Sequence, residues 1–329
     1  MLSRVANSLY WMNRYLERAE NTARLIESQL HMLLDLPTMR QDPNAWKPLV
    51  DITGDYQYFS ENYKGYSREN VMFFHTFDRN YPHSIISCLT AARENARSVR
   101  EIIPSEMWEN INNLYLTIVE PGSIQDAAKT PYKFYLNIKM ACHLITGIAY
   151  STMSHGEAWN FSELGRLLER ADKTSRILDV KYFIILPRID YVGSSLDSVQ
   201  WTALLKSTSS LEMYRKRFNL ISSKNIVDFL VFDREFPRSI RYCIYHAERA
   251  FFNISGTPFG VYDNDLARQF GKLTGKLNYS HIDEVMAVGV HQFLDEIQSD
   301  LNQVSSVIHD NFFAIKSVAE INQSGVQIQ

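Results

Sequence analysis

The chain has 329 residues, of which 45% are hydrophobic, so it can form a sizeable core and is not globally disordered. Its 13 glycines and 10 prolines are too few for a collagen-like or Gly-rich linker protein, and they disfavour a large α/β enzyme with many tight loops. Lys and Arg total 34 against 37 Asp and Glu, a net charge of −3 without a basic block. We therefore expect no nucleic-acid partner.

The cysteines and the first twenty residues indicate the cellular compartment of the protein. Cys88, Cys142 and Cys243 are far apart and form no C-x-x-C motif, so we expect no disulfide framework and no metal site. Charged residues interrupt the first twenty positions, which do not resemble a secretory signal, and no apolar run reaches 18 residues. We expect a soluble cytoplasmic protein that spans no membrane and carries no cofactor.

Helical periodicity dominates the chain from its first residues. Apolar or small side chains recur at alternating intervals of three and four, the pattern of a helix that packs lengthwise, and Pro37 marks its end. The stretches 131–154 and 281–309 are further long helices, and Pro82 and Pro237 suit helix starts. The main β-like stretch, 182–191, is interrupted by Pro187, so we predict an all-α fold. The stripe of the first helix consists of Leu9, Met12, Leu16, Ala19, Ala23, Ile26, Leu30 and Leu33.

Two segments of the chain occur twice. Residues 14–27 (RYLERAENTARLIE) match 166–179 (RLLERADKTSRILD) at seven of fourteen positions. Residues 77–92 match 232–247 at eight of sixteen, with nearly the same offset. These collinear matches indicate an internal duplication with halves at 1–152 and 153–329. We predict one helical-bundle domain over 1–329, built from two halves related by a pseudo-two-fold axis and sharing one core.

The duplicated helix carries charged residues on the face opposite its apolar stripe. This face could be solvated, with weak surface ion pairs. It could instead form a buried structural network, for which arginine is well suited. In a third interpretation, arginines of both halves clamp a carboxylate or phosphate and the glutamates orient them. We favour the network over the ligand site. The residues concerned are Arg14, Glu17, Arg18, Arg24, Arg166, Glu169, Arg170 and Arg176.

Secondary candidates lie at the second repeated element and at the start of the second half. The sequence F-D-R-x-x-P-x-S-I reads first as a helix start with acidic groups that complement the helix dipole. An anion site on exposed N–H groups is the alternative. The polar stretch at 155–159 reads as a turn in which Trp159 anchors the next helix. The candidates are Asp78, Arg79, Asp233, Arg234, His155 and Glu157.

The repeated segments also carry a family resemblance. The opening LSRVANSLYWMNRYLERAENTARLIE, together with 77–112, 157–179 and 232–249, resembles the bacterial alpha-E domain family, helical proteins named for a Glu-Arg motif. The motif falls on Glu17-Arg18 and again on Glu169-Arg170. The resemblance implies companionship with ATP-grasp-type ligases and transglutaminase-like proteins encoded nearby, and a role in an amide-forming or peptide-modifying system. The resemblance implies no particular chemical reaction.

Two functions follow as hypotheses. The first is a non-catalytic helical partner or scaffold of an ATP-grasp-type ligase, which binds a peptide or carboxylate ligand between its halves. The absence of a nucleotide loop or a nucleophile triad motivates it. The second is an enzyme for amide or carboxylate substrates, in which Glu17 and Glu169 act as general acid and base and arginines stabilise an oxyanion.

Overall fold

The computed structural model describes residues 1–36, 41–185 and 195–314, and this part of the chain is helical without strands, as predicted. Its first eight helices are α1 Ser3–Asp35, α2 Lys47–Thr53, α3 Tyr56–Asn62, α4 Arg68–Thr76, α5 Ile85–Ser98, α6 Ser105–Val119, α7 Ser123–Lys129 and α8 Pro131–Thr152. The next eight are α9 Glu157–Ile185, α10 Ser195–Ser207, α11 Leu211–Arg217, α12 Ser223–Phe232, α13 Ile240–Ser255, α14 Asp265–Tyr279, α15 Ile282–Val288 and α16 Val290–Ile308, followed by a π-helix at His309–Phe313.

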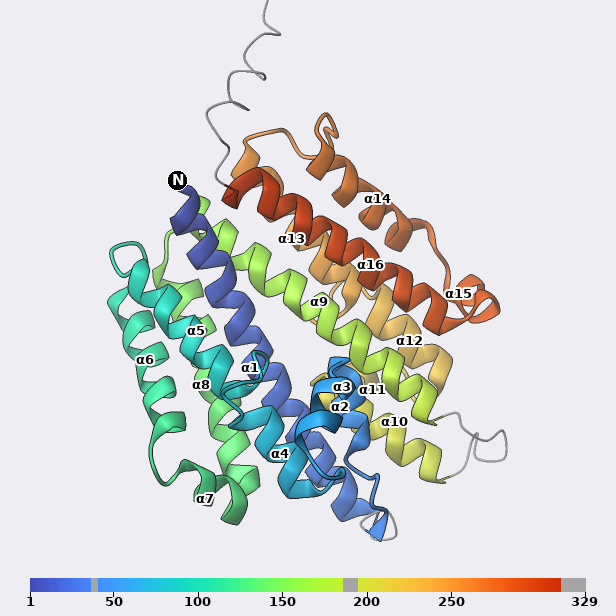
Figure 1. Cartoon of the computed structure of the whole chain (residues 1–329). Coiled ribbons are helices and arrows are strands. Elements are labelled where there is room, and N and C mark those ends of the chain that lie inside the picture. Colours follow the sequence, from blue (N-terminus) through green and yellow to red (C-terminus); the bar gives the residue numbers. More distant parts are fainter. Residues whose placement is uncertain (37–40, 186–194, 315–329) are drawn as a thin grey trace, which may run out of the picture.

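The two longest helices, α1 and α9, run side by side through the centre of the molecule and point in the same direction (Figure 1). Their close approach depends on Gly165, because a Cβ atom there would lie 2.2 Å from the backbone oxygen of Tyr10. The predicted apolar stripe of α1 is buried from Leu9 to Leu33. It faces the helices of its own half, so the opposite face of α1 is left for α9.

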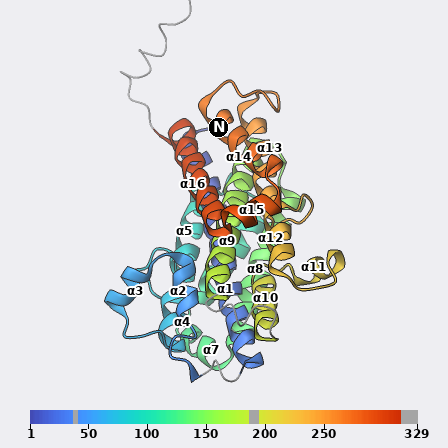
Figure 2. The same cartoon turned by 90° about the vertical axis from the view of Figure 1, so that its right-hand side faces the viewer.

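The packing partners follow the same order in both halves. Helix α1 packs on α5 and α8, and α9 packs on α13 and α16. Helix α6 lies against α5 and α8, and α14 lies against α13 and α16. Figure 2 shows α3 and α11, which follow α2 and α10, projecting on opposite sides. This order agrees with the predicted duplication, which stays an interpretation of the sequence.

Helices are also exchanged across the boundary between the halves. The short helix α2 packs on α9, and α10 packs on α1. Some apolar side chains also cross this boundary. Tyr10, Leu25 and Ile52 pack in the core of the second half, and Phe161 packs in the core of the first. The prediction of one shared core is therefore wrong. Each half has its own apolar cluster, because the faces that α1 and α9 turn toward each other are charged.

Local details differ from the expected helix boundaries. The helices near Pro82 and Pro237 begin three residues later, at Ile85 and Ile240, because the hydroxyls of Ser84 and Ser239 cap them. Of the β-like stretch 182–191, the first four residues continue α9 and the remainder lies outside the described residues. None of the described helices combines the length and the apolar character needed to cross a membrane.

Candidate functional site: the charged interface between two long helices

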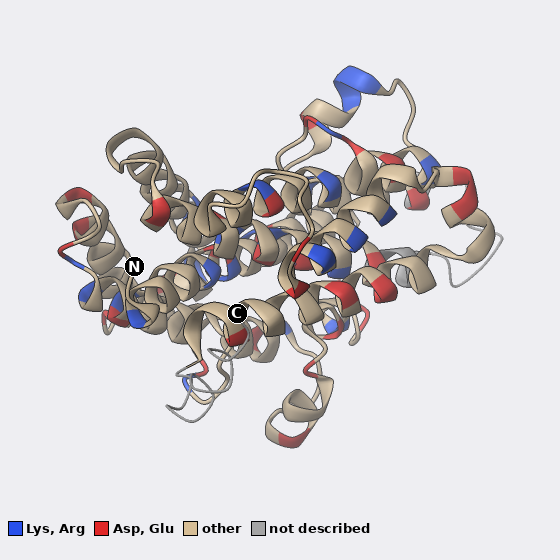
Figure 3. Cartoon of the chain, turned by 90° about the horizontal axis from the view of Figure 1, so that it is seen from above, with Lys and Arg blue, Asp and Glu red and all other residues tan. Residues whose placement is uncertain are grey.

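The repeated Glu-Arg residues of both halves meet between α1 and α9. Figure 3 shows acidic and basic residues together along these central helices. The interpretation as a solvated face is wrong, because Glu169 has no exposed surface and Glu17, Arg18 and Arg170 are also buried. Two parallel helices that carry the same charged face bring these residues opposite each other, which intrahelical spacing alone did not predict.

The two Glu-Arg motifs form reciprocal ion pairs. Arg18 donates from Nε and Nη2 to the two carboxylate oxygens of Glu169, at 2.6 and 2.9 Å. Arg170 donates in the same way to Glu17, at 2.9 and 2.7 Å. Each arginine thus uses its planar fork on a carboxylate of the other half, the strongest common geometry for this pair. These two reciprocal ion pairs join the halves, and we call them the clasp.

A second arginine reaches Glu169 from the first half. The Nε atom of Arg14 donates to it at 2.9 Å, and the Nζ atom of Lys173 lies 3.7 Å away. Burial alone would raise the pKa of Glu169, but Arg18 and Arg14 outweigh burial and hold the pKa well below its usual range. This carboxylate is ionised at neutral pH.

Glu17 has an equally crowded set of donors. Besides Arg170, it accepts from Nη1 of Arg238 at 3.1 Å and from the side-chain amide of Asn21 at 3.0 Å. Burial opposes its ionisation, yet Arg170 and Arg238 lower the pKa of Glu17 to about 2. A group with this pKa does not carry a proton near neutral pH, so it cannot act as a general acid there, and it is a weak base.

Sequence reasoning missed Arg238 and Glu20, which extend the network. Arg238 also donates from Nη2 to both oxygens of Glu20, at 3.1 and 2.9 Å. Glu20 in turn forms an ion pair with Arg24 and contacts Nε2 of His143 at 3.0 Å. The signal was present in the repeat, because Arg238 aligns with the basic residue His83 in the matched segments.

The two halves differ at this aligned position. His83 faces Arg18, whose Nη1 lies 2.8 Å from His83 Nδ1. Burial and the charge of Arg18 lower the pKa of His83 to about 4, so the ring is neutral and Nδ1 accepts the bond. Burial, and then the charges of Arg24 and Arg170, lower the pKa of Arg238 to about 10. The second half therefore places a cation where the first half places a neutral ring.

The remaining predicted residues pair within their own helix. Arg176 donates to Asp172 at 2.9 Å, which repeats the contact of Arg24 with Glu20. Arg166 donates to Glu163 at 2.9 Å. All eight residues of the predicted Glu-Arg face thus lie at or beside the interface, and each forms an ion pair with a residue of opposite charge.

The second repeated element forms a turn closed by hydrogen bonds and not an open anion site. The Oδ1 atom of Asp78 accepts from the backbone N–H groups of Asn80 and Tyr81, at 2.9 and 3.3 Å. Asp233 accepts from the matching groups of its own turn, at 2.8 and 2.7 Å. These carboxylates occupy the donors that an anion would need. Arg79 and Arg234 are exposed.

His155 and Glu157 lie outside the network. The ring of His155 stacks on Trp159, with centroids 4.2 Å apart, and its Nε2 lies 3.0 Å from the backbone oxygen of Tyr150. Glu157 is exposed and contacts the amino group of Met1 at 3.1 Å. His155 thus lies in the turn before α9, and Glu157 is the first residue of that helix.

A cavity of about 420 Å³ opens beside the network, where α8 and α1 of the first half meet α9 of the second. Glu17, Glu20 and Arg170 form its inner wall, and His143 and Tyr150 of α8 lie at its outer side. A ligand in this cavity would contact Glu17 and Arg170 of the Glu-Arg motifs. Its other lining residues are Asn13, Leu16, Cys142, Thr146, Gly147, Ser151 and Arg166.

Neither metal ligands nor activated thiols accompany this cavity. Within the described ranges, no group of three or more His, Cys, Asp or Glu side chains is placed to hold a metal ion. All three cysteines are buried, and burial raises the pKa of Cys88 and of Cys243 to about 12. A buried thiol with a raised pKa is a packing residue and not a nucleophile.

Comparison with known proteins identifies the family of the chain. The chain matches uncharacterized protein Mb2597 of Mycobacterium bovis and uncharacterized protein Rv2567 of Mycobacterium tuberculosis, each 22% identical over 97% of the chain. It spans only 36% of the length of these relatives. No solved structure matches it significantly. Residues 1–313 match Alpha-E, described as a predicted alpha-helical domain with a conserved ER motif, and the chain belongs to this family.

Proposed function

We propose that the chain is a non-catalytic helical partner of an ATP-grasp-type ligase or a transglutaminase-like protein, in a system that forms or modifies amide bonds. In this proposal the cavity between the halves holds a peptide or carboxylate ligand. Because such a ligase draws on cytoplasmic ATP, the proposal also places the chain in the cytoplasm.

The main observation in support of this proposal is the apolar outer face of α8. Leu136, Met140, Leu144 and Tyr150 lie on this face and are 44%, 56%, 53% and 66% exposed. An apolar stripe that none of the described helices covers is typical of a surface that binds another protein. The stripe leads to the cavity between the halves, which Tyr150 also lines.

The second half provides an internal comparison. Helix α16 takes the place of α8 in the packing order, so general folding requirements act on both helices alike. The exposed residues of α16 are all polar: His291, Gln292, Asp295, Glu296, Ser299, Asn302, Gln303 and Ser306. The exposed apolar side chains of α8 are therefore not a demand of the bundle, and a docked partner explains them.

The relatives fit the same proposal. About two thirds of each mycobacterial relative lies outside the part that matches this chain. A domain that occurs within a longer polypeptide works beside other protein modules, and this supports a role as a partner.

The charged network supports a non-catalytic role over the enzyme hypothesis. A general acid or base works best with a pKa near the operating pH. Glu17 has a pKa of about 2, and two arginines hold the pKa of Glu169 well below its usual range. Their geometry suits a clasp between halves, since each already accepts from two or more side-chain donors.

Co-purification with an ATP-grasp-type ligase from the same organism tests the proposal. We expect the ligase to be retained by the native chain and to be lost with Leu144→Glu, which puts a charge into the apolar face. Gln303→Glu on α16 is the matched control, because it lies equally far from the start of its helix, and we expect it to retain the ligase. The absence of association, together with no calorimetric binding of the ligase's peptide substrate, would overturn the proposal.

A further inference from the structure

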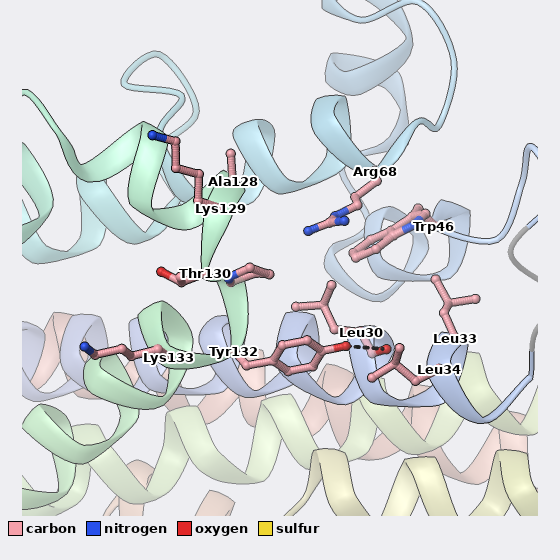
Figure 4. Close-up of a pocket in the computed structure, with 11 residues that line it drawn as sticks. Leu30, Leu33, Leu34, Trp46, Arg68, Ala128, Lys129, Thr130, Tyr132 and Lys133 are labelled. Carbon is pink, nitrogen blue, oxygen red and sulfur yellow. Dashed lines mark hydrogen bonds between the residues drawn. The ribbon is translucent and has the colours of Figure 1, made fainter.

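A larger cavity, of about 750 Å³, lies wholly within the first half, beyond the charged part of α1 (Figure 4). The end of α1, the residue before α2, the start of α4 and the turn from α7 into α8 surround it. Its apolar walls are Leu30, Leu33, Leu34, Trp46 and Tyr132. This size and lining are typical of sites for organic ligands.

The charged residues of this cavity are all basic. Arg68, Lys129 and Lys133 line it, no acidic residue does, and none of the three forms an ion pair with any described residue. Arg68 is half-buried, and Figure 4 shows its guanidinium reaching into the cavity beside Trp46 and across from Tyr132. Its Nε lies 3.5 Å from the sulfur of Met72, a weak acceptor. A cation without a counter-charge at an apolar wall favours an anion with an apolar body.

The cavity is open on one side, which bears on the kind of ligand. Leu34 is 48% exposed, and Ala128 and Thr130 at the rim are exposed as well. A ligand bound here can therefore continue into solvent as a chain. Arg68 reaches into the cavity, so the anionic group must sit beside the apolar group that fills it. Within a peptide, only the last residue has a carboxylate on the same Cα as its side chain.

We propose that this cavity binds the C-terminal residue of a peptide. An aromatic or branched aliphatic side chain packs against Trp46 and Leu33, and the terminal carboxylate pairs with Arg68. Lys129 and Lys133 add a positive field at the rim that attracts acidic chains. The site lies apart from the cavity between the halves and does not depend on the function proposed for that cavity.

Calorimetry on the full chain tests the site with two probes that differ only at the terminus: acetyl-Ala-Leu-Phe with a free carboxylate, and its C-terminal amide. We expect the free acid to bind at least about tenfold more tightly, because charge-assisted bonds to arginine are stronger than neutral ones. Arg68→Gln removes this preference. Arg215→Gln, an exposed substitution on α11, leaves it intact.

Two further variants identify the site without relying on one substitution. Arg68→Lys keeps the charge but loses the planar fork, so we expect it to retain part of the preference for the acid. Trp46→Phe identifies the cavity, because it removes any fluorescence change that the peptide causes there. Equal binding of acid and amide, an undiminished preference in Arg68→Gln, or no binding of the free acid would overturn the proposal. Decanoate that binds as tightly as the peptide would overturn its assignment to a peptide terminus.

Discussion

Replacement of Glu169 by glutamine removes the counter-charge of two arginines while it keeps the shape of the side chain. Glu169 is fully buried and accepts two bonds from Arg18 and one from Arg14. A glutamine leaves both guanidinium groups largely out of water without a negative partner. Breaking a buried ion pair in this way costs about 3–5 kcal/mol, and the second arginine places this variant toward the upper end.

Urea unfolding followed by circular dichroism measures this loss as a lower midpoint at an unchanged slope. The matched control is Glu163→Gln, since Glu163 lies less than two turns away on α9 and pairs with the partly exposed Arg166. We expect the control to cost less than about 1 kcal/mol. A loss of less than about 1 kcal/mol in Glu169→Gln, or an equal loss in both variants, would refute the view that the clasp stabilises the fold.

Three further predictions concern pH, packing and thiol access. The pKa of Glu17 lies below its unfolded value of about 4.5, so its contribution to stability is complete above about pH 5 and is lost as the pH falls toward 2. Through this group, urea midpoints should be similar at pH 7 and pH 5 and lower at pH 3. Gly165→Ala should cost about 1–3 kcal/mol by overpacking, whereas Gly147→Ala, where a Cβ meets no atom within 4 Å, should be neutral or stabilising in the same assay. Cys88 and Cys243 should react with a thiol reagent only after unfolding, and rapid labelling of the native chain would contradict their burial.

Much of the fold could be predicted because helical periodicity is a local signal. The stripe from Leu9 to Leu33 identified the face of α1 that is buried in its own half. It could not show that the opposite face is buried as well, since charged residues at helical spacing look the same on a solvated surface. The predicted single core failed for this reason: the charged faces lie between two apolar clusters.

Helical spacing identified most residues of the charged interface but not how they pair. Helical spacing relates residues of one helix only, and on α1 it places Arg14 three positions before Glu17. In the structure Arg14 donates to Glu169 at 2.9 Å, because parallel packing of α1 on α9 brings this carboxylate within reach. Arg238 was missed since it reaches the interface from the turn before α13, and a periodic pattern in α1 carries no information about that turn.

The exchange of α2 and α10 across the boundary makes the protein an intramolecular dimer. The connection between Thr152 and Glu157 is short, so it holds the two halves at a high effective concentration. If the chain were cut there, each fragment would lose one short helix from its long central helix and would expose glutamates and arginines with half their partners. Neither fragment has a complete surface of its own. The two should regain the native helical content only when mixed.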